Sequence, residues 1–376
     1  MVRRVALGLF LCAMWTTAGC TQVPVSKEPS VPEARGDGWT TASATSAGMA
    51  PERLLAMDAA IRSNEFKKIT SVVIARQGKL VYEAYFGGAN FTTLMNTRSA
   101  TKTVTSMLVG VAIDRGLLAG VDALVLPFFA DRVETRNADP RKQAITVEDL
   151  LTMSSALECN DSDDKSAGNE ERMYPTKDWL QFALSIPAKP AAPPGNPAPP
   201  YGRSFSYCTA GVFTLGQVLG RATKTPVDEF AKKALFAPMG IEKMKWAYSP
   251  IGQPQTGGGL ELASRDLLKL GQLGLNGGMW NGTRLVPDSW FKQSTQPHAR
   301  VDDSTEYGYL WWLRGFNAGG KTFAAYSMFG NGGNKVSVFP QLELVVVITS
   351  TNYNTKGMHQ QTDRLLTDFI LASLGN

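Results

Sequence analysis

The sequence predicts an α+β protein in which an antiparallel sheet, completed by both ends of the chain, is flanked by helices and carries an inserted all-helical lobe. Three observations support this fold class. Strand patterns occur early, at residues 71–86. Helical patterns then dominate from Ser99 to about residue 235. Strand patterns return after residue 307 and precede a last amphipathic helix. We expect a cleft between the two lobes.

The first 20 residues, MVRRVALGLFLCAMWTTAGC, have the form of a signal peptide, with two arginines, an apolar run and small residues before Cys20. The apolar run is shorter than the stretch of about 20 residues that spans a membrane. Residues 17–20 resemble a bacterial lipobox, although Thr17 stands where leucine is usual, so lipidation of Cys20 and ordinary cleavage nearby are both open. We expect an exported protein of the bacterial periplasm or cell envelope, anchored by a lipid on Cys20, with residues 21–45 as a flexible tether.

The composition is that of a folded protein. Of the 376 residues 43% are hydrophobic, which is enough for one large globular unit or two modest ones. The net charge is +5, but the lysines and arginines are scattered, so no nucleic-acid-binding surface is expected. Beyond the signal segment and Cys20, only Cys159 and Cys208 remain. In an oxidising compartment these two predict a disulfide, and two separate buried thiols are the alternative.

Each element follows from a local pattern. Residues 71–86 are two β-rich runs around Gln77-Gly78, which is the pattern of a hairpin. Residues 187–202 are rich in proline, which excludes a helix or a central strand and predicts a stiff loop. Helices are predicted at VEDLLTM, TKDWLQFALSI, AGVFTLGQVLGRA, VDEFAKKALFAPM and ASRDLLKLGQLGLNGG, and strands near residues 308–313, 323–329, 336–339 and 345–349.

A serine three residues before a lysine occurs three times, as Ser99/Lys102, Ser162/Lys165 and Ser289/Lys292. A lysine can deprotonate a serine only if it is neutral near pH 7, and burial favours that state whereas acidic neighbours oppose it. Lys165 is surrounded by aspartates in NDSDDKS, which should keep it charged. Lys292 lies in the short polar segment PDSWFKQSTQ and is expected at the surface. Neither pair is a good catalytic candidate.

The segment that follows Ser99 is different, because it is apolar around its whole circumference, as a buried helix is. At the first turn of such a helix Ser99 and Lys102 share a face, since residues three apart are neighbours. The positive end of the helix favours an alkoxide, but its effect is about 2 kcal/mol at most, so burial has to contribute more. A capping serine beside a solvated lysine is the alternative.

Several segments resemble the serine hydrolases of the serine β-lactamase and penicillin-binding-protein family, especially the class C-like β-lactamase-related esterases and amidases. The first is SATK, which begins at Ser99. FSYCTAGVFTLGQVLG is similar to the family's Tyr-x-Asn segment and implies Tyr207 as a second catalytic group, with Thr209 in place of asparagine. ITVEDLLTMSSAL, GGGLELASRDLLKLGQLGLNGG and YGYLWW are further similar segments, in the family's order.

The resemblance covers about residues 46–373 and implies the serine β-lactamase/DD-peptidase-like fold. It implies one catalytic domain, with an α/β lobe formed by residues 46–95 and about 255–373. The helical lobe would be about residues 96–254. Residues 1–20 would be the signal peptide and residues 21–45 the tether.

The resemblance implies catalysis through an acyl-enzyme, without a cofactor or a metal. Ser99 would attack a carbonyl carbon, Lys102 would take the serine proton directly or through Tyr207, and water would release the acyl group. Thr209 would contact the substrate or the lysine, with one hydroxyl in place of an amide. A disulfide between Cys159 and Cys208 would hold Tyr207 in position.

Two N–H donors should stabilise the oxyanion of the reaction. One would be the backbone N–H of Ser99. The other is expected at Asn331, after Gly330, because residues 328–330 stand where the family has Lys-Thr-Gly or His-x-Gly. An ordinary glycine-rich hairpin is the alternative. Since Met328 cannot bind a carboxylate as the family's lysine does, we expect neutral substrates, although an arginine from elsewhere could replace that lysine.

These observations predict an exported serine hydrolase that acts on an ester or a small amide, as a carboxylesterase or amidase does. A β-lactamase or a DD-carboxypeptidase is the alternative within the same chemistry. A catalytically silent envelope protein that binds cell-wall fragments or a partner is the alternative of another class. The expected partners are a small acyl substrate and, through the N-terminal lipid only, a membrane.

Overall fold

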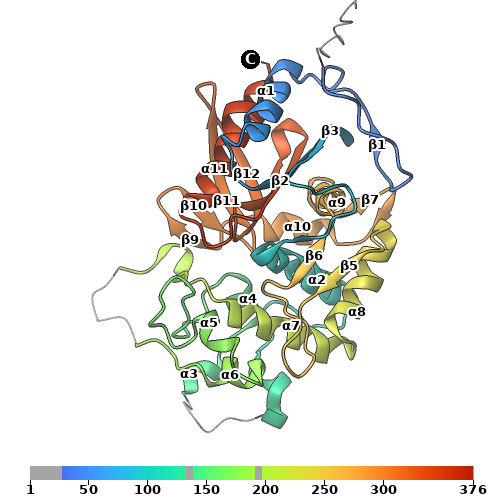
Figure 1. Ribbon diagram of the computed structural model, residues 1–376. Coiled ribbons are helices and arrows are strands. Elements are labelled where there is room, and N and C mark those ends of the chain that lie inside the picture. The colour runs from blue at the N-terminus through green and yellow to red at the C-terminus, as the bar shows by residue number, and fades with distance from the viewer. Residues whose placement is uncertain (1–27, 133–138, 191–196, 376) are drawn as a thin grey trace, which may run out of the picture.

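The computed structural model describes residues 28–132, 139–190 and 197–375, so the signal segment and Cys20 lie outside the described residues. Within them, a nine-stranded sheet forms the upper half of the molecule in Figure 1, in the order β1-β3-β2-β14-β13-β12-β11-β10-β9. The strands are β1 (Thr40–Thr41), β2 (Ile69–Arg76), β3 (Lys79–Tyr85), β9 (Ala299–Asp302), β10 (Thr305–Tyr307), β11 (Trp312–Ala318), β12 (Lys321–Gly330), β13 (Asn334–Phe339) and β14 (Leu344–Ser350).

The two ends of the chain meet in the middle of this sheet. β2 pairs with β14 in antiparallel register, with Val72 opposite Ile348. The predicted hairpin is present, and Gln77 and Gly78 both have positive φ, at 53° and 73°, as a two-residue loop between twisted strands requires. The α+β fold with a sheet completed by both chain ends is therefore confirmed. The one parallel pair among the described strands is β1 with β3.

The strand predicted at residues 308–313 was wrong in its first half, because β11 begins only at Trp312. The chain makes a tight turn before it, in which the Gly308 N–H donates to the Trp311 carbonyl at 2.9 Å. Leu310 has a φ of 61°, which an extended strand does not allow.

Helices cover both faces of the sheet. On one face α1 (Pro51–Arg62) packs with the C-terminal segment, in which α11 (Met358–Arg364) runs into a π-helical turn at Leu365–Ile370. On the other face lies α9 (Ser264–Leu275). A Cβ at Gly271 of α9 would lie 2.5 Å from Val345 Cγ1, so only glycine permits this close approach of helix and strand.

The helical lobe forms the lower half of the molecule. Its helices are α3 (Pro140–Gln143), α4 (Val147–Leu151), α5 (Glu170–Met173), α6 (Trp179–Ser185), α7 (Thr209–Thr223) and α8 (Val227–Ala231). The remaining elements are α10 (Asp288–Ser294), a small sheet of β4 (Met95–Asn96), β6 (Leu260–Leu262) and β5 (Met244–Trp246), and the pair β7 (Met279–Trp280) and β8 (Thr283–Arg284).

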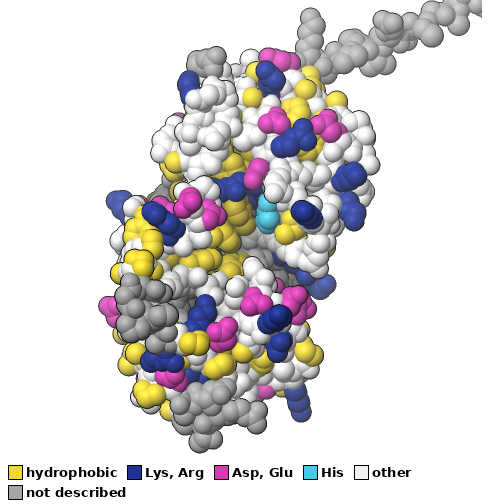
Figure 2. Space-filling view, turned by 90° about the vertical axis from the view of Figure 1, so that its left-hand side faces the viewer, with side chains coloured by type: hydrophobic (Ala, Val, Ile, Leu, Met, Phe, Trp, Pro, Cys, Tyr) yellow, Lys and Arg dark blue, Asp and Glu magenta, His cyan; other side chains and the backbone are white. Residues whose placement is uncertain are grey.

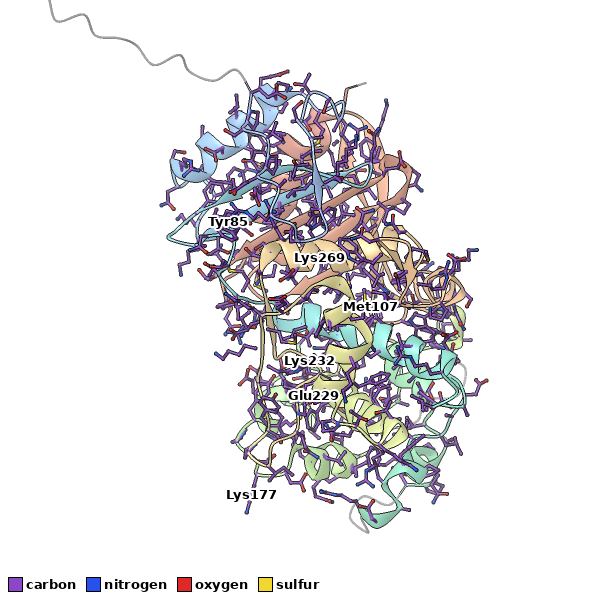
Figure 3. All side chains as sticks on the ribbon, turned by 90° about the vertical axis from the view of Figure 1, so that its right-hand side faces the viewer. Tyr85, Met107, Lys177, Glu229, Lys232 and Lys269 are labelled. Atoms are coloured by element: carbon purple, nitrogen blue, oxygen red, sulfur yellow. A yellow bond between two sulfur atoms is a disulfide. The ribbon has the colours of Figure 1, made fainter. Side chains whose placement is uncertain are left out.

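Helix α2 (Thr101–Asp114) lies between the two halves, because it packs against β12 on one side and α7 on the other. Met107, labelled in Figure 3, lies on this helix in the middle of the molecule and is fully buried. Every side chain from Thr101 to Ala112 is buried, as the apolar sequence predicted. The helix therefore places its first turn at the boundary between the sheet and the helical lobe.

The expected flexible tether is wrong over residues 28–45. Trp39 is buried against Trp280, with ring centroids 5.4 Å apart, and Thr40–Thr41 forms β1. The Thr45 N–H also donates to the Glu28 carboxylate at 3.0 Å. A large indole in a polar stretch is thus what attaches this segment to the domain. In the described part of the chain no helix has the length and apolar character needed to cross a bilayer.

Candidate active site

Ser99 lies in a single 3-10 turn, Arg98–Ala100, that leads directly into α2. The turn is attached to the small sheet, since Thr97 Oγ1 donates to the Leu260 carbonyl at 2.8 Å. Arg98 has a positive φ of 51°, a conformation that is rare for residues other than glycine, asparagine and aspartate. The Ser99 side chain is half-buried, so it remains open to a substrate.

Lys102 is buried, with 1% of its surface exposed. Its Nζ lies 3.1 Å from Ser99 Oγ, 2.9 Å from Thr209 Oγ1 and 2.5 Å from the Gly257 carbonyl oxygen. The structure therefore contradicts the alternative of a solvated lysine beside a capping serine. A neutral amine has two N–H donors and one lone pair, and the carbonyl can only accept. In the structure Nζ donates to all three oxygens. When the amine is neutral and its two N–H groups are given to Gly257 and Thr209, its lone pair is free to accept the Ser99 proton.

The Tyr207 side chain lies next to Ser99 and Lys102. Lys102 Nζ lies 4.9 Å from the centre of the Tyr207 ring. Burial raises the pKa of the Tyr207 hydroxyl, and the charge of Lys102 and a hydrogen bond with Ser99 lower it in part. The net direction is upward, so the phenol is neutral near pH 7 and has a proton to donate. The structure thus brings the three predicted catalytic side chains together.

Thr209 begins α7 and is fully buried. Its hydroxyl accepts a hydrogen bond from Lys102, which is the lysine contact that was expected for it. A Cβ at Gly257 would lie 2.7 Å from Thr209 Cγ2, so glycine is needed where this carbonyl approaches Lys102. Gly257 was missed as a lysine partner, because a backbone carbonyl leaves no signal in a sequence beyond the GGG segment itself.

The disulfide predicted between Cys159 and Cys208 is present, with the two Cα atoms 5.3 Å apart. Cys208 lies between Tyr207 and Thr209, so the bond attaches both site residues to the loop after α4. In the same loop the Asp161 carboxylate accepts a hydrogen bond from the Thr209 N–H at 2.7 Å. Asp161 was also missed, because its sequence context, NDSDDKS, is that of a polar loop.

The end of β12 closes the site on the sheet side. A Cβ at Gly330 would lie 2.1 Å from the Thr97 carbonyl oxygen, so this strand end contacts the turn that carries Ser99. Asn331 follows, and its side chain exchanges hydrogen bonds with Asn354, from Nδ2 to Oδ1 at 2.5 Å and from the Asn354 N–H at 2.8 Å. These contacts fix the loop in which the second oxyanion donor is predicted. The assignment of that donor to Asn331 stays a prediction.

An aromatic wall adjoins the catalytic side chains. Trp312 lies at its centre, with its ring 5.6 Å from Tyr207, 5.7 Å from Phe329, 6.2 Å from Phe205 and 5.1 Å from Tyr307. Figure 2 shows hydrophobic side chains gathered in a hollow between the upper and lower parts of the molecule, on the side where β9, β10 and β11 lie. This surface suits the uncharged part of a substrate.

The two rejected pairs lie at the surface. Ser162 and Lys165 are exposed. The Lys292 side chain is 77% exposed and pairs with Asp288 at 2.6 Å. Burial thus separates Ser99 and Lys102 from both pairs of the same spacing.

Fold and family together define a serine hydrolase. The sequence matches the Beta-lactamase family over residues 67–369, and the chain belongs to this family. No curated protein sequence matches it.

A structure described as a 6-aminohexanoate-dimer hydrolase from Bacillus anthracis has a TM-score of 0.65 at 20% identity, over 82% of this chain and 80% of that chain. A family VIII carboxylesterase has a TM-score of 0.62 at 17% identity, over 84% and 95%. A D-stereospecific amidohydrolase from Streptomyces sp. has a TM-score of 0.60 at 18% identity, over 83% and 97%.

Proposed function

We propose that the protein is an exported carboxylesterase or small-amide hydrolase that acts through an acyl-enzyme on Ser99. The contact that supports this most directly is the 3.1 Å distance between Lys102 Nζ and Ser99 Oγ at the N-terminal end of the buried helix α2. The esterase and amidohydrolase among the structural neighbours show the fold, and their activities are consistent with the proposal.

Acylation begins when Lys102 takes the Ser99 proton and the serine oxygen attacks the substrate carbonyl carbon. The new C–O bond forms as the carbonyl electron pair moves to oxygen, and backbone N–H groups near Ser99 and Asn331 stabilise that oxyanion. The carbonyl then re-forms and the bond to the leaving group breaks. The leaving group takes a proton from Tyr207, which is restored from Lys102. Water enters and the same groups act in reverse order to release the acid.

A neutral substrate is favoured because this chain lacks the lysine that relatives of this class carry in the strand motif before the second oxyanion donor. Met328 occupies that position here and is fully buried in the core. Lys335, on the next strand β13, is buried and paired with Asp363. Trp312 and Phe205, two partly exposed side chains next to Tyr207, are aromatic.

The second candidate, a β-lactamase or DD-carboxypeptidase, is favoured by one observation. Arg98 is exposed directly before Ser99, and its guanidinium carbon lies 4.1 Å from the centre of the Tyr353 ring. A guanidinium in this place could bind the carboxylate of a lactam or of a peptide. This is the arginine that could replace the missing lysine.

A substrate panel separates these candidates. Turnover of p-nitrophenyl acetate, a chromogenic cephalosporin and a D-alanyl-D-alanine peptide is measured with the same enzyme preparation. The proposal expects kcat/KM for the ester to exceed that for the lactam and the peptide. Faster hydrolysis of the cephalosporin or the peptide would select the second candidate. Hydrolysis of none of the three would favour the silent binding protein.

Export and lipid attachment are part of the proposal and rest on the sequence of residues 1–20, with its two arginines, apolar run and TAGC ending. Expression of the full chain in a bacterium, followed by fractionation and mass determination, tests both. Lipidation predicts an amphiphilic mature protein that begins at Cys20, and Cys20→Ser releases it in soluble form. A cytoplasmic protein that retains Met1 would contradict export.

A further inference from the structure

Asp161 lies behind the catalytic side chains and is held by three backbone contacts. Its N–H donates to the Tyr207 carbonyl at 2.9 Å. Its Oδ2 accepts from the Thr209 N–H at 2.7 Å, and its Oδ1 accepts from the Glu170 N–H at 2.9 Å. One residue thus binds the backbone on both sides of Cys208. It is also two residues from Cys159, so the disulfide fixes the same loop.

Thr209 connects this carboxylate to the lysine. Its N–H is bonded to Asp161 and its hydroxyl to Lys102 Nζ, at 2.7 Å and 2.9 Å. A displacement of Asp161 would therefore move the hydroxyl that orients the amine. Lys102 and Tyr207 carry the proton transfers proposed above, and Asp161 takes part in none of them.

The charges around Asp161 come from three elements. Lys102 on α2 attracts the carboxylate, and Glu170 on α5 repels it. The hydroxyls of Tyr174, directly after α5, and of Tyr207, before α7, complete the set, and Tyr174 donates to Glu170 Oε2 at 2.6 Å. Burial, and after it Glu170, raises the pKa of Asp161 to about 6, against the opposing effects of Lys102 and the Thr209 bonds.

We propose that Asp161 is a positioning residue whose carboxylate balances the ammonium that forms on Lys102 during acylation, an inference that rests on the proposed function. When the Ser99 proton moves to Lys102 nitrogen, the amine becomes a cation in a site with little water. A fixed anion connected to Lys102 through Thr209 favours the cation over the neutral amine, in the same sense as the acidic neighbours of Lys165. It therefore assists proton transfer from Ser99 once the amine is neutral. Protonation of Asp161 removes the anion, so the acylation rate should fall as the pH falls through this titration.

The test measures kcat and KM for p-nitrophenyl acetate between pH 5 and pH 8 in the wild type, Asp161→Asn, Glu170→Gln and Asp164→Asn. In the wild type kcat/KM should rise with a midpoint near 6, the pKa of Asp161. Asp161→Asn should lack this rise. It should also lose about tenfold in kcat at pH 8 with little change in KM, since one nearby opposite charge changes a protonation equilibrium by about tenfold or more. Asp164→Asn is the matched control, because Asp164 is exposed in the same loop.

Glu170→Gln is the decisive variant. It keeps both N–H groups that bind Asp161 and a carbonyl oxygen for Tyr174, but it removes the repelling charge. The midpoint should therefore move to lower pH while kcat at pH 8 is kept. This holds even if Asp161→Asn unfolds, which its melting curve will show, since asparagine can accept only one of the two bonds.

The two proposals fail in different ways. The inference is overturned if the wild type hydrolyses the ester but Glu170→Gln leaves the midpoint of the kcat/KM rise at the same pH. In that case Asp161 does not cause the loss of kcat/KM at low pH. The same conclusion follows if a folded Asp161→Asn keeps the wild-type profile. If the wild type hydrolyses no ester, amide or lactam at any pH, the proposed function itself is contradicted.

Discussion

The backbone carbonyl of Gly257 accepts a hydrogen bond of 2.5 Å from Nζ of Lys102. This contact comes from a segment 155 residues away in the sequence. It matters because a carbonyl can only accept, so it fixes one N–H of the amine and limits how Nζ can turn. The Thr209 hydroxyl orients the second N–H. The proposed catalytic role of Lys102 therefore depends on residues that lie outside the Ser-x-x-Lys motif.

Lys102→Met should lower kcat for ester hydrolysis by about 100-fold or more, because methionine fills the space but cannot take a proton, and a positioned base contributes about 10²–10⁴ in rate. Steady-state kinetics with p-nitrophenyl acetate measures this. Lys165→Met is the matched control, since Lys165 also follows a serine by three residues but is exposed. An equal loss in both variants would mean that Lys102 is not the base.

Tyr207→Phe should lower kcat by about 100-fold and leave KM nearly unchanged, because it removes only the hydroxyl that passes a proton to the leaving group. The ring and its contact with Trp312 remain. The loss should be smaller for an activated p-nitrophenyl ester than for an alkyl ester, whose leaving group needs the proton more. Tyr248→Phe serves as the control, since this tyrosine is exposed and bonded to Asp228. Equal losses for both esters would contradict the relay role.

Removal of the disulfide should lower both stability and activity. The bond closes a loop between positions 49 apart, and a loop of this size corresponds to about 2–4 kcal/mol of stabilisation. Cys159→Ala should lower the melting temperature and also kcat, since Cys208 adjoins Tyr207. The wild type in reductant should behave in the same way, and the double variant Cys159→Ala/Cys208→Ala should not respond to reductant. Unchanged kinetics after reduction would show that the bond does not position Tyr207.

Gly330→Ala should lower kcat by about tenfold or more, because the new Cβ would lie 2.1 Å from the Thr97 carbonyl and has to displace either the strand end or the Ser99 turn. Loss of one oxyanion donor alone costs about 10²–10³ in rate. Gly120→Ala is the control, since a Cβ there would meet no atom within 4 Å. Full activity of a folded Gly330→Ala would move the second oxyanion donor away from this strand end.

The sequence predicted the fold class and the central pair of the site because both leave periodic or local signals. The whole circumference of the segment after Ser99 is apolar, whereas aspartates surround Lys165 and a short polar segment carries Lys292, and these differences separate Ser99/Lys102 from the two surface pairs. Cysteine counting predicted the bond between Cys159 and Cys208, since no other pair remained beyond the signal segment.

The contacts that complete the site leave no such signal. Gly257 acts through its carbonyl, which every residue has, and Asp161 lies among the other polar residues of NDSDDKS. Both contacts arise only when segments distant in the sequence fold together, Gly257 against Lys102 and Asp161 against Thr209. The packing of residues 28–45 was missed for a similar reason, because a polar composition hid the one buried indole, Trp39.

Intact-mass analysis after treatment with a fluorophosphonate tests the central claim most directly. The account predicts one covalent adduct on the wild type, located on Ser99 by peptide mapping, no adduct on Ser99→Ala, and labelling of Lys102→Met slower by about 100-fold, in line with the loss of the base. A folded wild-type protein that takes up no label, or that carries the label at a serine other than Ser99, would contradict it.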